Sequence, residues 1–253
     1  MDRPEGNRRG RRLDEILVGR GLFASRSRAR DAILRGAVRV DGAVAAKPGE
    51  AVGQDAAIVI DDPASAYVSR AALKLIHGLD AFGFDPARRT ALDIGASTGG
   101  FTQVLLERGA SHVIAVDVGH GQMPPSLAAD PRVTSLEGVN ARSLDATALG
   151  GRAPDIVVCD VSFISIRLAL PPALSLAAAG ALAVILVKPQ FEAGRDAVGK
   201  GGIVDPKLAE ETAASFREWL DGQPGWRVVG LVESPVLGGD GNREFLLGGV
   251  KDR

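Results

Sequence analysis

The chain has 253 residues, of which 45% are apolar and 24% charged, so a wholly disordered protein is excluded and one or two folded domains are expected. The single cysteine, Cys159, excludes a disulfide framework, and three histidines without metal-ligand spacing predict no metal site. The net charge of −1 conceals an asymmetry, because residues 1–60 hold 12 basic against 8 acidic side chains, whereas residues 61–253 hold 18 against 23. Such an asymmetry is typical of a nucleic-acid-binding module joined to a second domain, although a solvated basic face gives the same pattern.

The sequence predicts neither a membrane protein nor an exported one. No apolar stretch follows the basic start, residues 1–12. The longest apolar run, residues 173–187, is too short to span a bilayer and contains Gly180. We therefore expect a cytoplasmic protein without a membrane partner.

Residues 12–42 predict a small helical module that ends in a hairpin. Leu13, Ile16 and Leu17 have helical spacing. Ser25 or Ser27 can cap a second helix, which ends at Gly36. Alternating valines then lead to Asp41-Gly42, a strong signal of a tight turn.

This stretch closely resembles the S4 RNA-binding module, through its opening RLD and the pattern SR-x-x-A-x-x-x-I-x-x-G-x-V-x-V-x-G that follows. S4 modules recognise folded RNA by its shape and backbone rather than by its base sequence. Guanidinium groups bind phosphates bidentately, and arginines gather on and around the second predicted helix. The predicted RNA-binding residues are Arg12, Arg26, Arg28, Arg30 and Arg35.

Beyond residue 63, predicted strands and helices alternate. Strands are predicted at residues 91–95, 113–117, 156–160 and 182–187, helices at 99–108, 165–178 and 206–220, and two final strands at 227–233 and 244–248. Continuous apolar runs are typical of parallel strands that are buried on both faces. The order predicts an α/β protein with a doubly wound, Rossmann-like sheet.

A glycine-rich turn, GASTGG, follows the first of these strands. Such a turn lets the backbone approach a ligand closely at the carboxyl edge of a sheet. Asp93 lies just inside the strand end, and Asp117 ends the next strand, where a carboxylate can accept hydrogen bonds from ribose hydroxyls. The spacing differs from the G-x-G-x-x-G of dinucleotide-binding proteins and resembles that of S-adenosylmethionine-dependent methyltransferases.

That resemblance implies S-adenosylmethionine as the cofactor. The predicted cofactor-binding residues are Asp93, Gly95, Ala96, Ser97, Thr98, Gly99, Gly100, Phe101, Asp117, Val118, Glu137, Asn140 and Asp160. For Asn140 the sequence leaves two interpretations open, a contact to the adenine or a hydrogen bond within its own turn.

Two lysines and two acids predict which atom is methylated. Lys188 follows a buried strand, where a charge is costly unless it is paired, and Asp160 and Glu244 offer that pairing. Lys74 is a second cation that can reach the same edge. A ribose 2′-hydroxyl is a poor nucleophile that must be oriented and deprotonated, and a lysine desolvated beside another cation gives up its proton more easily.

Base methylation is the alternative chemistry. The segment Asp160-Val-Ser-Phe163 lacks both prolines of the tetrapeptide found in amino-methylating enzymes. A C5-pyrimidine enzyme needs a cysteine nucleophile, whereas Cys159 is interpreted as a buried core thiol.

From Arg12 to about Gly248 the chain resembles the TlyA family, ribosomal-RNA 2′-O-methyltransferases in which an S4 module precedes an FtsJ-like catalytic domain. The motifs that carry this resemblance are YVSRAALKL, LDIGASTGGFTQVLLERGA, VDVGHGQM, CDVSFIS, LVKPQFEAGRDAVGKGGIV and SPVLGGDGNREFL. It implies a catalytic set of Lys74, Asp160, Lys188 and Glu244, and a cytidine ribose in ribosomal RNA or ribosomal subunits as target. Many members carry Gly-Gly where this chain has Ala71-Ala72.

We expect a basic tail and S4 domain over residues 1–60, a linker over residues 61–70 and the methyltransferase domain over residues 71–253. Two rival functions belong to other classes. The family has also been labelled haemolysin, but the sequence offers no spanning segment and its basic helix lacks a broad apolar face. A non-catalytic S4 assembly factor is disfavoured by the presence of Lys188 and of the glycine turn.

Overall fold

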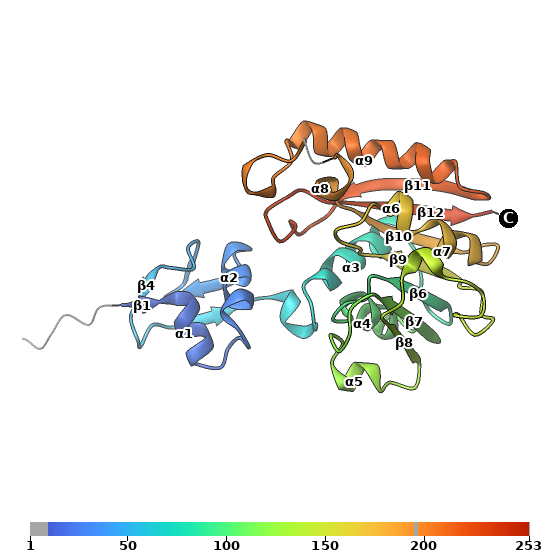
Figure 1. The fold of residues 1–253 in the computed structure, drawn as a ribbon. Helices are drawn as coiled ribbons and strands as arrows, with labels where there is room; N and C mark the ends of the chain where they lie inside the picture. The colour runs from blue at the N-terminus through green and yellow to red at the C-terminus, as the bar shows by residue number, and fades with distance from the viewer. Residues whose placement is uncertain (1–9, 195–196, 253) are drawn as a thin grey trace, which may run out of the picture. The chain divides into compact units, whose positions relative to one another are not determined.

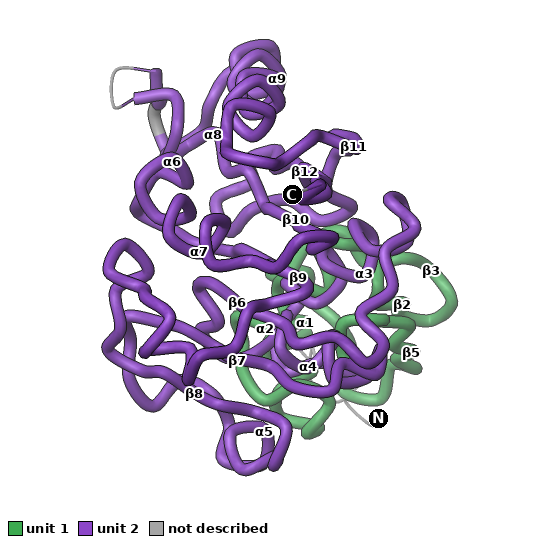
Figure 2. Tube along the Cα trace, turned by 90° about the vertical axis from the view of Figure 1, so that its right-hand side faces the viewer, with its two compact units in different colours: residues 1–65 green, residues 66–253 purple. Residues whose placement is uncertain are grey.

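The computed structural model describes residues 10–194 and 197–252, and the chain divides into two compact units, residues 1–65 and residues 66–253 (Figure 2). The division falls inside the stretch expected to be a linker. Asp62, within that stretch, is buried, and its carboxylate accepts hydrogen bonds from Arg35 at 2.7 and 3.1 Å, so it is part of the first unit.

The first unit combines two helices with short strands. Its elements are β1 (Arg11–Arg12), α1 (Leu13–Gly19), α2 (Arg26–Leu34), β2 (Val38–Val40), β3 (Ala43–Val44), β4 (Ala51–Val52) and β5 (Ile58–Ile60). Ser25, rather than Ser27, caps α2, since its hydroxyl accepts the N–H of Arg28 at 3.3 Å. Asp41 and Gly42 both have positive φ, as a two-residue hairpin turn requires.

The second unit is built on one seven-stranded sheet with the order β11-β12-β10-β9-β6-β7-β8. Its strands are β6 (Thr90–Ile94), β7 (His112–Asp117), β8 (Val133–Glu137), β9 (Ile156–Cys159), β10 (Leu182–Val187), β11 (Trp226–Glu233) and β12 (Phe245–Lys251). Its α-helices are α3 (Ala71–Phe82), α4 (Gly100–Glu107), α5 (Pro125–Ala128), α6 (Ile166–Ala169), α7 (Pro171–Leu176), α8 (Pro189–Glu192) and α9 (Pro206–Asp221). Neighbouring strands run parallel from β10 to β8, and β12 is antiparallel to both its neighbours, so the expected doubly wound α/β sheet is confirmed.

Helices cover both faces of this sheet (Figure 1). Alternate residues of β10 serve the two faces, because successive side chains of a strand point in opposite directions. Leu182, Val184 and Leu186 belong to the cluster that includes α3 and α4. Ala183, Ile185 and Val187 belong to the cluster that includes α6, α7 and α9. The strand is therefore buried on both sides, as its continuous apolar sequence predicts.

The helix expected over residues 165–178 is instead two short helices, α6 and α7. Pro171 and Pro172 begin α7, and proline is suited to the first turn of a helix because it has no N–H to donate. The last strand also begins one residue later than expected, so Glu244 lies just before β12 rather than within it.

The sheet order places a ligand site between β6 and β9. β7 and β8 follow β6 toward one edge of the sheet, whereas β9 and β10 lie on the opposite side of β6. Ligands of open α/β sheets bind at such a switch point, beyond the carboxyl ends of the strands. The turn after β6 and the loops after β9 and β10 meet there.

Candidate active site

The glycine turn after β6 is shaped by the neighbouring loop. Gly95 and Gly99 have φ of 83° and 86°, values that favour glycine. A Cβ atom on Gly95 would lie 2.7 Å from the main-chain oxygen of Asp160. The turn therefore needs glycine at this position so that β6 can end against the loop that carries Asp160.

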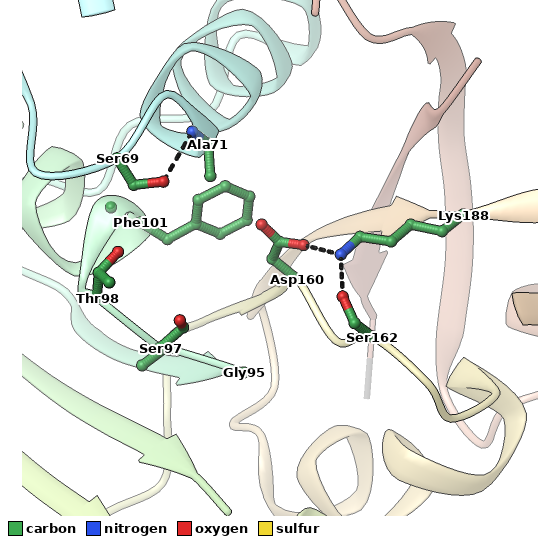
Figure 3. A pocket seen from close by; sticks show the side chains of 11 residues that line it. Ser69, Ala71, Gly95, Ser97, Thr98, Phe101, Asp160, Ser162 and Lys188 are labelled. Carbon is green, nitrogen blue, oxygen red and sulfur yellow. Dashed lines mark hydrogen bonds and ion pairs between the residues drawn. The ribbon is translucent and has the colours of Figure 1, made fainter. Parts of the chain in front are cut away.

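A pocket opens beside this turn (Figure 3). Its lining includes seven of the residues expected to bind the cofactor: Gly95, Ala96, Ser97, Thr98, Gly100, Phe101 and Asp160. Ser69, Ala71, Ser162 and Lys188 complete it. Ser69, Ala71 and Ser162 were not predicted as site residues, although the motifs YVSRAALKL and CDVSFIS contain them.

Asp93 lies under the turn, fully buried. Its Oδ2 atom accepts a hydrogen bond from the Thr102 hydroxyl at 2.7 Å, whereas Oδ1 has no hydrogen-bond partner among the described residues. The pKa of Asp93 is raised to about 7, mainly by burial and also by the negative charges of Asp160 and Asp117, while the hydrogen bond from Thr102 opposes the rise. The structure thus keeps an incompletely satisfied carboxyl group directly below the pocket.

The other predicted cofactor residues lie around the loop that follows β7. Asp117 accepts the N–H groups of Ser97 at 2.8 Å and Gly119 at 2.7 Å. Glu137 accepts the N–H of Gly121 at 3.0 Å with both oxygens. These two carboxylates brace the loop.

Asn140 and Val118 lie on the same side of the sheet. The Asn140 side chain accepts the N–H of Arg142 at 3.0 Å, which is the hydrogen bond within its own turn that the sequence left open. Val118 is exposed. Gln122 also belongs to this region, because Ser97 Oγ donates to its side-chain oxygen at 2.7 Å. It was not predicted as a site residue, although the motif VDVGHGQM contains it.

Two lysine–carboxylate pairs lie at the carboxyl edge of the sheet. Lys188 Nζ is 2.6 Å from Asp160 Oδ1 and donates to Ser162 Oγ at 2.7 Å. Lys74, from α3, forms an ion pair with Glu244. The three long side chains, Lys74, Lys188 and Glu244, are only 5%, 8% and 2% exposed, so their charges are held largely away from water.

The strand register brings the two pairs to the same place. Val187 pairs with Phe245 in the antiparallel β10–β12 ladder, so Lys188 and Glu244 occupy the next position along it. Gln190 links them further, since its Nε2 atom donates to Glu244 Oε1 at 3.3 Å. All four residues predicted to be catalytic therefore meet at one edge, with Glu244 bound to Lys74 rather than to Lys188.

The loop after β9 is tied to α8 along its length. The ring of Phe163, a residue with φ of 65° and 90% exposed, packs tilted on Phe191 with centroids 5.0 Å apart. Glu192 accepts the Ser165 hydroxyl at 2.6 Å and the N–H of Ile166 at 2.8 Å. The loop that carries Asp160 and the segment that carries Lys188 are thus one connected structure.

Cys159 behaves as the core thiol that the sequence indicates. It is fully buried among the apolar residues of β6 and β10, and burial raises the pKa of its thiol to about 12. A thiol with so little thiolate at neutral pH is a poor nucleophile.

In the first unit, Arg12, Arg26 and Arg35 make ion pairs with carboxylates, although all three are expected to bind RNA. Arg12 and Arg26 both contact the buried Asp14 at 3.0 Å. Arg35 binds Asp62 at 2.7 Å and Asp31 at 3.1 Å.

Arg28 and Arg30 are exposed on α2. The phosphate-binding role of all five arginines stays a prediction. Within the described ranges, no helix is long and apolar enough to cross a membrane.

Known proteins resemble this chain over nearly its whole length. The model of the S4 domain matches residues 11–58, and that of the FtsJ-like methyltransferase matches residues 67–251. The 16S/23S rRNA (cytidine-2′-O)-methyltransferase TlyA of Mycobacterium tuberculosis is 49% identical over 93% of this chain and 88% of its own length. Hemolysin A of Brachyspira hyodysenteriae is 39% identical over 93% of this chain and 98% of its own.

A solved structure agrees with these matches. A hemolysin candidate from Streptococcus thermophilus superposes with a TM-score of 0.74 at 38% identity, covering 97% of this chain and 90% of that one. Both domain matches, the sequence identities and the fold lead to one assignment. The chain belongs to the TlyA family, in which an S4 domain precedes an FtsJ-like methyltransferase domain.

Proposed function

We propose that this protein transfers a methyl group from S-adenosylmethionine to the ribose 2′-hydroxyl of a cytidine in ribosomal RNA. The observation that carries the proposal is the pair of buried lysine–carboxylate contacts beside the glycine-lined pocket. The name of the M. tuberculosis relative supports the substrate class. An oxygen nucleophile needs a base and a positive environment at the reacting atom, and these contacts offer both.

The pocket residues fit S-adenosylmethionine. The glycine at position 95 lets the pocket-lining turn pack against the main chain of Asp160. The carboxyl group of Asp160 in the pocket lining, with those of Asp93 and Asp117 at the ends of β6 and β7, suits a ligand with a positively charged sulfonium and ammonium group. The unpartnered Oδ1 atom of Asp93 is one such acceptor. When bound there, S-adenosylmethionine supplies the electrophilic methyl group.

The protein's own residues then act on the ribose. Lys188, in its neutral form, accepts the proton of the 2′-hydroxyl while that oxygen takes the methyl group. Asp160 holds the Lys188 side chain at 2.6 Å. Lys74, held by Glu244, adds positive charge where the oxygen develops negative charge.

Substitutions of Lys188 test this role. Lys188→Ala should bind cofactor and RNA normally but lose roughly 10²–10⁴-fold in rate, the usual worth of a positioned acid–base group. Lys188→Arg should fail nearly as badly, because a guanidinium keeps its proton. Lys207→Ala, which removes an exposed lysine on α9, is the matched control and should react at the unmutated rate.

The methylation rates of these three variants are measured in single-turnover reactions with undermethylated ribosomal subunits. A Lys188→Arg variant with a rate close to that of the unmutated protein would show that Lys188 supplies only charge, and the assignment of the base would be wrong.

A further inference from the structure

The groups around Lys188 determine the orientation of its amine as well as neutralising its charge. An ammonium nitrogen has three N–H directions besides its bond to carbon. One donates to Ser162 Oγ, 2.7 Å away (Figure 3). Asp160 Oδ1 lies 2.6 Å from the same nitrogen as an ion-pair partner, without an aligned hydrogen bond. Ser162 thus gives this pocket-lining nitrogen a hydrogen-bond direction that the Asp160 contact does not.

Ser162 is well placed to set that direction. It lies in the pocket wall, two residues beyond Asp160. The loop around it is anchored to α8 by the Phe163–Phe191 contact and by the hydrogen bonds that Glu192 accepts from Ser165 and Ile166. The main chain that follows Ser162 is therefore anchored, and the Ser162 hydroxyl itself accepts a hydrogen bond from Lys188 Nζ.

We propose that Ser162 is a positioning residue for methyl transfer, whose hydroxyl orients Lys188 Nζ toward the 2′-hydroxyl while the Asp160 carboxylate holds the amine beside the pocket by charge. This inference rests on the proposed role of Lys188 as the base. When Lys188 is neutral, an N–H group that donates to Ser162 limits the rotation of the amine and so the direction of its lone pair. The proton of the 2′-hydroxyl then passes to that lone pair as the oxygen–methyl bond forms and the bond between the methyl carbon and the sulfonium sulfur breaks, with S-adenosylhomocysteine as the leaving group.

The role predicts a change in pH dependence. The ionisable groups around Lys188 are Asp160 and Cys159 at the end of β9 and Glu244 just before β12, with Lys74 of α3 paired to Glu244. Ser162 is the neutral acceptor in this set. Removing it withdraws one hydrogen bond from the ammonium form, so the neutral form is reached at lower pH.

The experiment measures single-turnover rates of the full chain on undermethylated ribosomal subunits across a range of pH. Ser162→Ala should lower the maximal rate by about 10-fold and move the midpoint of the ascending limb to lower pH by on the order of half a unit. Affinities for S-adenosylmethionine and for the subunits should stay unchanged. Ser162→Thr keeps the hydroxyl and should restore both the rate and the midpoint.

Ser111→Ala is the matched control, because it removes an exposed serine hydroxyl just before β7 of the same unit, which donates to the main-chain oxygens of Arg88 and Arg89 and not to the loop beside Lys188. Any loss of rate in that variant should come without a shift in the midpoint.

Two results would overturn the role of Ser162: a midpoint that stays in place in Ser162→Ala, or a Ser162→Thr variant as slow as Ser162→Ala. The Lys188→Ala variant separates the two proposals. If it is inactive while Ser162→Ala behaves like the unmutated protein, only the inference about Ser162 fails. If Lys188→Ala keeps its rate, the proposed function of Lys188 itself is wrong.

Discussion

Asp93 is a buried acid whose charged form is destabilised by its surroundings. Its carboxyl group is fully buried, and burial with two neighbouring negative charges raises its pKa to about 7. A carboxyl group whose pKa is raised on folding favours the folded state at low pH. That contribution is present below its unfolded pKa of about 4 and is lost as the pH rises through about 7.

The variant Asp93→Asn should therefore gain thermal stability over the unmutated protein at pH 8 and show little gain at pH 5. Thr102 can still donate to the asparagine oxygen, so the packing is kept. Cofactor affinity should rise with pH through about 7 in the unmutated protein and stay weak and flat in the variant.

Melting curves and titration calorimetry at several pH values check both effects. Asp85→Asn, at an exposed position of the same unit, is the control. Identical pH dependence in Asp93→Asn and in the unmutated protein would refute this account of Asp93.

The pairing of the lysines with the acids at the candidate site was only partly predictable from the sequence. The sequence indicates that Lys74, Asp160, Lys188 and Glu244 meet, because three of them adjoin predicted strand ends and buried charges need partners. Which acid holds which lysine depends on α3, whose packing on the sheet brings Lys74 to Glu244 across 170 positions of sequence. Ser162 lies inside a recognised motif, but its contact with Lys188 depends on the path of the loop.

At the scale of elements, α2 is held to the first unit by Arg35. This guanidinium bridges Asp31, one turn earlier in the helix, and Asp62, which precedes the unit boundary. Burial alone would raise the pKa of Asp62, but the hydrogen bonds from Arg35 and from the N–H of Ala64 outweigh it and lower that pKa. Arg35→Ala should therefore destabilise the first unit by on the order of 3 kcal/mol, because it leaves a buried carboxylate unpaired.

Arg30→Ala, on the same helix, is the control for Arg35→Ala. Arg30 is exposed, so its loss should change stability by less than about 0.5 kcal/mol while weakening RNA binding. Hydrogen exchange over residues 10–65 is the suitable measurement, since both tryptophans lie in the second unit and fluorescence does not report on the first. Equal exchange in Arg35→Ala and Arg30→Ala would contradict the structural role of Arg35.

Elements were predictable where the sequence carries a long pattern. Both ends of β10 were predicted correctly, because a run of six apolar residues is typical of a parallel strand that is buried on both faces. By contrast, β1 and β4 have two residues each and pair across forty positions, which no local pattern reveals. The same limit applies to Arg12, Arg26 and Arg35, because their carboxylate partners became visible only in the folded unit.

At the scale of the whole molecule, the two units have separate cores, and we expect the first to bind RNA and the second to bind the cofactor. The apolar cluster of the first unit shares no residue with the clusters around the sheet. Deleting residues 1–65 should therefore leave cofactor affinity nearly unchanged but remove most methylation of ribosomal RNA.

RNA affinity of the full chain should fall steeply with salt concentration, and the truncated chain should show a shallower slope, since fewer phosphates are neutralised. Filter binding at several salt concentrations measures this. An RNA affinity insensitive to both salt and truncation would contradict an RNA-binding role for the S4 domain.

The site of the transferred methyl group is the most direct test of the proposed chemistry. Undermethylated ribosomal RNA is treated with the protein and S-adenosylmethionine, and the product is examined by nucleoside mass spectrometry and by alkaline hydrolysis. We predict a methyl group on the ribose of a cytidine and resistance to alkali at that nucleotide, because a methylated 2′-oxygen cannot attack the neighbouring phosphate. A methyl group on the base, with normal alkaline cleavage at that position, would contradict the assignment of the Lys74, Asp160, Lys188 and Glu244 site to 2′-hydroxyl methylation.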